Sequence, residues 1–543
     1  MKLTQRFAAI LSVILAGVMI CSLLLLKPET SWAQVSPKGE IPQVSIGDKI
    51  PANGYEIPAN PSPLGERKEA IGEFAWKTFV ALNWPANCQN GSPLTDKKIG
   101  EAPGEPRVWE FYNFPEDVFK PNGEKPNTKL VKPPTCPETK ENDTAQQLQS
   151  HVQPQPLLSN LTEFGDDPTF ELAAPSSRND SCEGLEGVKP IICLAGDFVL
   201  VDRLGNYVIS DARMNPAEVD QIVKKKWYSA AKLKEQGFNN PLKGTPFQLL
   251  CSSKVPNGAF PTNNNPKVPC TETSTDVNTS MGTIELKAAW MVLPDSDSGV
   301  PNMQLPDPSR YYTTKLKLSV KTPEDKEKET TVPVALIGFN LLHKTSQTGW
   351  VWSTFEHIDN VPPSTAPSTA NPRGCDTPLP SKYPYNLYDP NFPDREKNKS
   401  LANPPYLWRD QFPHAVTENK ENKGDIVAQT PSQITRQVCI PSFVNQLNTK
   451  WQEKLQDTVW QNYQLIGIQW LGSPYNPYEG GNLEFPRLIN VALEPYPQEV
   501  KNQFGEKLGI DGFSCVGCHI KAKLPKSVGD IYSDFSFLMN NAK

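Results

Sequence analysis

The chain has 543 residues, a formal net charge of −6 and 55 prolines. A mildly acidic protein of this kind is a poor candidate for nucleic-acid binding. The length allows two to four domain-sized cores. The proline content, about twice the average usage, requires much of the chain to be extended or looped.

Residues 1–33 have the pattern of an export signal. Lys2 and Arg6 precede an uncharged apolar run at 7–26, and a small-x-small cleavage pattern ends at Ala33. The run is also long enough to span a bilayer, so an uncleaved membrane anchor remains the alternative. Both alternatives place the rest of the chain outside the cytoplasm, in the periplasm or an equivalent compartment.

A proline-rich linker is expected at 34–65, followed by an α+β body at 66–440 with a central antiparallel sheet, flanking helices and long proline-rich loops. Apolar residues at helical spacing predict a helix from Glu66 that stops at Pro85. Residues 86–160 are expected to be mostly loop.

A β-hairpin is predicted over 198–210, with its turn at Gly205-Asn206. Asn215 and Pro216 open a helix as cap and first-turn residue, and Gly237 is its expected stop. Four β-branched and aromatic runs then predict an antiparallel meander: Thr283–Leu293, Tyr311–Val320, Val332–His343 and Trp350–Ile358.

A helical C-terminal region is expected at 441–543, beginning with a long helix on which Val444, Leu447 and Trp451 share a face.

The cysteines predict disulfides, because eight of them, an even number, lie outside the signal segment and the C-terminal motif of an exported chain. Sequential pairing is the simplest arrangement, with buried free thiols as the alternative: Cys88–Cys136, Cys182–Cys193, Cys251–Cys270 and Cys375–Cys439.

The C-terminal region contains Cys515-Val516-Gly517-Cys518-His519, the attachment pattern of a c-type haem. Two thiols three positions apart can each add to one vinyl group of the same porphyrin. The histidine that follows can then bind the iron as its proximal ligand. A redox dithiol and half of a zinc site are the alternative interpretations.

Only 24 residues follow His519, too few for a small class I cytochrome domain, so the upstream chain must enclose the haem. The first candidate for the distal iron ligand is His357, which lies in an aromatic-rich stretch. An open sixth position is the alternative. The other candidates are His151, His343, His414 and the methionines of the mature chain, Met539 among them.

Several stretches together resemble a family of large exported bacterial monohaem cytochrome c-like proteins. They are residues 74–85, His343-Lys344-Thr345, residues 352–360, residues 490–496 and the Cys-x-x-Cys-His motif. The resemblance runs in patches over most of residues 66–543. It implies one covalent haem c in an exported protein, and the family has no established substrate.

Three functions remain open from the sequence. A six-coordinate haem would transfer single electrons between partners. A haem with an open distal site would make the chain an oxidoreductase of the peroxidase or oxygenase type, and the third possibility is a haem-containing sensor or binding module. No catalytic residue is assigned.

Four lysines around the motif form either a solvated face or a docking site for an acidic redox partner: Lys507, Lys521, Lys523 and Lys526.

Overall fold

The computed structural model describes residues 64–94, 96–127, 131–136, 172–173, 193–194, 198–239, 246–251, 282–294, 305–324, 326–345, 349–363, 381–422, 424–471, 483–484, 488–496, 499–500 and 515–543. All of them belong to one compact unit, Gln43–Lys543. The predicted signal segment, nearly all of the linker, His151 and Lys507 lie outside the described residues.

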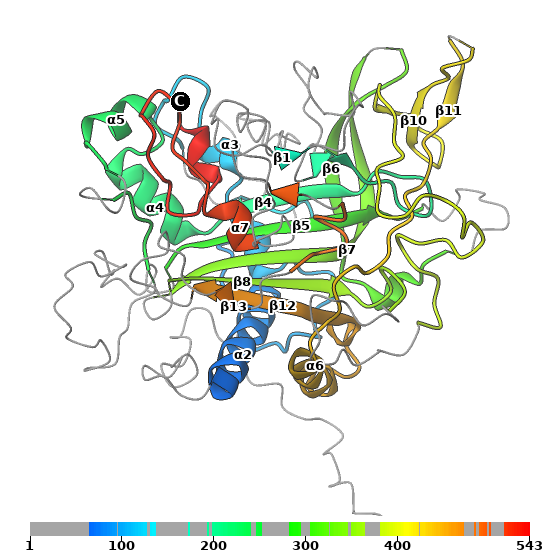
Figure 1. Ribbon diagram of the computed structural model, residues 1–543, viewed down its shortest axis with the longest axis horizontal. Helices are drawn as coiled ribbons and strands as arrows, with labels where there is room; N and C mark the ends of the chain where they lie inside the picture. Colours follow the sequence, from blue (N-terminus) through cyan, green and yellow to red (C-terminus); the bar gives the residue numbers. More distant parts are fainter. Residues whose placement is uncertain are drawn as a thin grey trace, which may run out of the picture. The chain divides into compact units, whose positions relative to one another are not determined.

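A seven-stranded antiparallel sheet forms the centre of the fold (Figure 1). Its strand order is β13-β12-β8-β7-β5-β4, and β6 pairs with β7. The predicted α+β class and the four predicted strand regions are confirmed. The bounds are β4 Ile209–Met214, β5 Ile284–Val292, β6 Thr313–Lys321, β7 Glu327–Thr345, β8 Gly349–His357, β12 Tyr463–Leu471 and β13 Leu483–Glu484.

The long strand β7 changes the expected meander. Its first part, up to Ala335, pairs with β6, whereas residues 334–343 pair with β5. Val334 and Ala335 pair with both β5 and β6, so these two neighbours lie on opposite edges of β7. β8 pairs with residues 338–345, on the edge that β6 uses for residues 327–335. A 19-residue strand can do this because it is twice as long as either partner.

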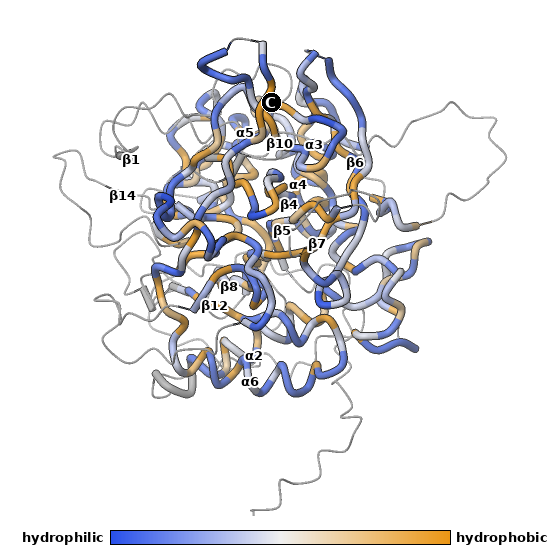
Figure 2. The backbone as a smooth tube through the Cα atoms, turned by 90° about the vertical axis from the view of Figure 1, so that its right-hand side faces the viewer, coloured by the Kyte–Doolittle hydropathy of each residue, from blue (hydrophilic) through white to orange (hydrophobic). Residues whose placement is uncertain are grey.

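Two helices cover one face of the sheet (Figures 1 and 2): α2 Leu64–Leu82 and α6 Ser442–Lys454. Phe79 of α2 stacks on Phe355 of β8 with ring centroids 4.2 Å apart. Trp76 stacks on Trp451 of α6 at 5.8 Å. Both predicted helices exist because their apolar stripes meet the apolar face of the sheet.

The opposite face carries α4 Pro216–Lys225, α5 Ala230–Glu235 and α7 Cys515–His519 (Figure 1). The Asn215 side chain caps α4 by accepting a hydrogen bond from the Glu218 backbone N–H. Lys226 adopts a left-handed conformation with φ 60° and ends the helix. The predicted single helix up to Gly237 is therefore two shorter helices.

Residues 441–543 were expected to be helical, but they also contain a central strand of the sheet. After α6 the chain forms β12, which pairs with β8. Residues 441–543 therefore contribute to the sheet of the preceding body.

The predicted hairpin at 198–210 has the expected turn, with Gly205 at φ +83°, and one bridge between Val201 and Tyr207. Its outgoing strand, β4, pairs with β5 instead.

The remaining elements are short. They are η2 Val108–Phe111, α3 Pro115–Val118, β1 Leu172–Ala173, β2 Cys193–Leu194, β3 Phe198–Val199, η5 Pro308–Arg310, β9 Leu407–Trp408, β10 Ala415–Glu418, β11 Ile426–Ala428, η6 Val459–Asn462, β14 Glu499–Val500 and η7 Leu538–Asn541. Among the described residues, no helix has the length and apolar character needed to cross a membrane.

The disulfide prediction is confirmed for its first pair, Cys88–Cys136. Cys251 and Cys439 are disulfide-bonded as well. Cys182, Cys270 and Cys375 lie outside the described residues. The two motif cysteines, Cys515 and Cys518, are the described cysteines that remain free thiols.

Candidate functional site

The motif helix α7 lies on the sheet face opposite α2 and α6. The Val516 backbone N–H donates to Gln469 Oε1 of β12 over 3.2 Å, and the Val516 side chain is buried in an apolar cluster beneath the helix. These contacts fix the start of α7. The thiols of Cys515 and Cys518 are half-buried on this short helix.

His519 is held by the chain that follows it. Its Nδ1 lies 2.7 Å from the Phe535 carbonyl oxygen. A carbonyl can only accept, so Nδ1 carries the proton and Nε2 keeps its lone pair. Burial lowers the pKa of His519 to about 4, so the ring is neutral. A neutral imidazole fixed through Nδ1 is the form in which histidine binds a metal through Nε2.

Aromatic side chains enclose the His519 ring. Its centroid lies 5.0 Å from that of Phe537 and 6.0 Å from that of Trp352 on β8. Trp352 also packs edge-on against Phe535 at 5.5 Å. Aromatic side chains from the C-terminal segment and from β8 therefore pack against the His519 ring.

Residues 520–536 fold back to bring the Phe535 carbonyl to His519. The return is closed by backbone hydrogen bonds from Ser533 to Ala522, 2.9 Å, and from Leu524 to Ile531, 2.9 Å. At its end Asp534 and Phe535 both have positive φ, 56° and 68°. Such conformations cost about 1–3 kcal/mol each in non-glycine residues and concentrate at functional sites.

A buried ion pair holds this strained segment in place. Asp534 accepts from Lys344 of β7 and, over 2.7 Å, from the Leu249 backbone N–H. Lys344 also donates to the Leu249 carbonyl over 2.8 Å. The residue next to Phe535 is thereby tied to the central sheet.

The donor set fits a c-type haem better than a redox dithiol. Burial raises the pKa of the Cys515 thiol, and raises that of Cys518 to about 11. Redox-active dithiols instead use a thiol with a lowered pKa. Two thiols and a histidine with a fixed tautomer on one helical turn would supply both thioethers and one iron ligand.

Polar side chains of the sheet and of residues 488–496 lie on the sheet face that carries the motif. Asn340 of β7 donates to both carboxylate oxygens of Glu494, over 3.0 and 3.1 Å. The Thr354 hydroxyl donates to Asn340 Oδ1 over 2.5 Å, which fixes the amide orientation. Lys287 of β5 lies opposite Asn340 in the sheet register. This polar group was not identified from the sequence, because its members are far apart in the chain.

The structure does not place His357 at the motif, which corrects the sequence-based ligand assignment. Side chains alternate along β8, so Trp352, which touches His519, and His357 point to opposite faces. Backbone groups occupy both ring nitrogens of His357. Nε2 lies 3.1 Å from the Arg310 carbonyl, and Nδ1 accepts from the Asp359 N–H over 3.2 Å.

The other predicted ligand candidates are also accounted for. His343 stacks on Phe74 of α2, on the face away from α7. His414 stacks on Trp408 of β9. Met539 is fully buried in the apolar cluster beneath α7. His151 lies outside the described residues.

Three of the four lysines around the motif lie in the described part of the chain. Lys526 is exposed, and Lys521 and Lys523 are half-buried. Lys523 pairs with Asp530 over 2.7 Å. The fourth lysine of the predicted group, Lys507, lies outside the described residues.

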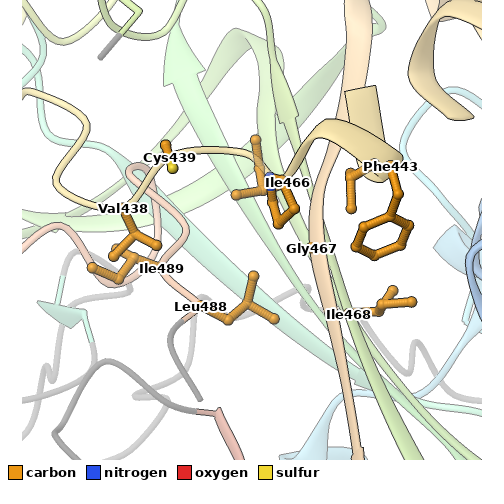
Figure 3. A pocket seen from close by; sticks show the side chains of 10 residues that line it. Val438, Cys439, Phe443, Ile466, Gly467, Ile468, Leu488 and Ile489 are labelled. Carbon is orange, nitrogen blue, oxygen red and sulfur yellow. The ribbon is translucent and has the colours of Figure 1, made fainter. Parts of the chain in front are cut away.

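A small pocket lies beside β12 (Figure 3). Figure 3 shows that its labelled side chains are apolar and come from residues 438–443, from β12 and from residues 488–489. Cys439 in its wall is disulfide-bonded. The lining thus offers packing surface and no ionisable group.

The sequence stretches on which the expected family resemblance was based meet at the sheet. Asn490 donates to the Thr354 hydroxyl over 2.8 Å and to the Phe355 carbonyl over 3.0 Å, and α2 packs on the other side of Phe355. Comparisons with protein-family models, with curated proteins and with solved structures found no match to this chain. The residues and contacts of this chain therefore carry the function proposed below.

Two buried carboxyl groups meet under the C-terminal segment: Glu218 of α4 and Glu285 of β5. Burial raises the pKa of Glu285 to about 7. The hydrogen bond with Ser536 lowers this pKa, and the Asp534 charge raises it. Burial together with the Glu285 charge raises the pKa of Glu218 well above its ordinary value. The folded chain therefore retains protons on this pair at pH values where free glutamates are ionised.

We expect the stability to fall as the pH rises from about 4.5 to about 8. The unfolded chain loses these protons near pH 4.5 and the folded chain near pH 7, so the loss is on the order of 3 kcal/mol for one proton. Glu285→Gln removes that titration and should flatten the dependence. Urea unfolding at several pH values measures both proteins. Equal pH slopes would show that Glu285 does not titrate in this window.

Proposed function

We propose that the chain is an exported monohaem c-type cytochrome that transfers electrons. Cys515 and Cys518 would carry the haem through two thioethers, and His519 would bind the iron. The observation that carries the proposal is the hydrogen bond from His519 Nδ1 to the Phe535 carbonyl, beside two free thiols on one helical turn. The haem supplies one-electron chemistry, and the protein sets its potential through ligands and burial.

The cysteines support export and attachment together. Cys88, Cys136, Cys251 and Cys439 are disulfide-bonded, as is common in oxidising compartments. The motif thiols are not paired with each other. Thioether bonds to a haem would leave neither cysteine as a free thiol in such a compartment.

A haem oxidoreductase with an open sixth position is the second candidate. The polar group formed by Lys287, Asn340 and Glu494 on the sheet favours it, because electron carriers need no ordered polar side chains beside the haem. In that case the same residues would contact a substrate.

Spectra separate the two candidates. The protein is expressed with a c-type maturation system, and oxidised, reduced and reduced-plus-CO spectra are recorded. A low-spin spectrum that CO leaves unchanged is expected for electron transfer, because both axial positions are filled. Rapid CO binding by a high-spin ferrous haem would instead favour the oxidoreductase.

A further inference from the structure

Lys287 lies on the motif side of the central sheet. It stands opposite Asn340 of β7, which in turn stands opposite Thr354 of β8. Paired residues share a face, and Trp352, two residues before Thr354, shares that face too. Trp352 contacts His519, and Figure 1 shows α7 on this side of the sheet. The Lys287 side chain is therefore directed to the face that carries the haem motif.

The ammonium group of Lys287 lacks a direct partner. Within the described parts of the chain it makes no hydrogen bond and no ion pair, although the side chain is half-buried on a central strand. Its neighbour across the sheet, Asn340, donates to both carboxylate oxygens of Glu494. Lys287 and Asn340 therefore lie on the same face of the sheet as Trp352, which contacts His519. A half-buried amine without a partner is costly unless a further group binds it.

Three other possible iron ligands on this face are already engaged. Glu494 is held through both oxygens by Asn340. Met214 and Met539 are fully buried in the apolar cluster. The Lys287 amine, in contrast, has no hydrogen bond or ion pair among the described residues and is available to bind a ligand.

We propose that Lys287 supplies the sixth ligand of the haem iron, through its neutral amine. This inference rests on the proposed function, since it presupposes a covalent haem at Cys515 and Cys518. Burial lowers the pKa of the Lys287 ammonium, which favours the neutral form that can bind a metal. Asn340 binds both carboxylate oxygens of Glu494, and Lys287 forms no ion pair among the described residues. The iron would be six-coordinate, as suits electron transfer.

The test compares three variants of the full exported chain with the wild type. Lys287→Leu removes the amine. Lys287→Arg keeps the positive charge, but a guanidinium stays protonated and does not bind iron. Lys317→Leu is the matched control, because Lys317 lies on β6 in a partly exposed pair with Glu329. Haem content, electron paramagnetic resonance and CO binding are measured for each protein.

We expect wild type and Lys317→Leu to be low-spin and insensitive to CO. Both Lys287 variants should lose the low-spin signal and bind CO, and added imidazole should restore a low-spin spectrum. A wild-type spectrum in Lys287→Leu, or a high-spin wild type, overturns the assignment of Lys287 while the covalent haem stands. Lack of covalent haem in the wild type overturns the proposed function itself.

Discussion

Replacing Asp534 with asparagine is expected to lower the free energy of unfolding by about 3–5 kcal/mol, because it leaves the buried Lys344 charge without its partner. Asparagine tolerates the positive φ of this position, 56°. The loss would therefore report on the charge and not on the backbone. Urea or guanidinium unfolding measures it.

A surface ion pair provides the matched control. Lys328 and Asp410 lie 2.6 Å apart with both side chains largely exposed. Asp410→Asn should change the stability by no more than about 1 kcal/mol. Adding Lys344→Met to Asp534→Asn should recover part of the loss, since no buried charge then remains. Equal small losses for Asp534→Asn and Asp410→Asn would contradict a stabilising role of the buried pair.

Replacing both motif cysteines with serine is expected to abolish covalently retained haem. Cys515→Ser and Cys518→Ser alone each leave one thiol, so each single variant should retain haem through one thioether. Lys526→Ala changes an exposed residue of the same segment and should keep full haem content. Haem staining after denaturing electrophoresis measures all four proteins.

The folded state of the double serine variant needs its own check. Far-ultraviolet circular dichroism should show the same strand and helix content as the wild type, because the sheet does not depend on the thiols. Covalent haem in the double serine variant would contradict attachment at these residues.

Local patterns in the sequence predicted most elements of the fold. Strands β5 to β8 and helices α2, α4 and α6 follow from apolar periodicity and capping residues near the chain positions where they occur. Strand partners depend on tertiary contacts. The pairing of β7 with both β5 and β6, and of β12 with β8, joins segments whose register no local pattern specifies.

The site was predictable only as far as its motif. Cys515, Cys518 and His519 are adjacent in the sequence, so their spacing alone indicates the chemistry. The contact from Phe535 to His519 depends on two residues at positive φ. Asp534 adopts this conformation readily, but Phe is a residue type that rarely does, so the sequence did not predict the return. His357 was favoured by its aromatic neighbours. Aromatic composition does not tell which face of a strand a side chain occupies, and His357 is on the other one.

Lys287 is a residue of the candidate site that the sequence patterns did not single out. In the sequence it is one lysine in an apolar strand, 232 positions before His519 in this numbering. The ligand role proposed for it depends on Asn340 and Glu494, which strand pairing and the return of residues 488–496 bring to the same face. A polar residue in the middle of a buried strand is the one local signal that could have singled it out.

The intact mass of the wild-type protein, matured in a c-type system and measured after haem extraction under denaturing conditions, tests the central claim most directly. We predict a mass above that of the processed chain by one haem, with the haem on the peptide that contains Cys515 and Cys518. A chain without haem, carrying free thiols or a Cys515–Cys518 disulfide, would contradict it.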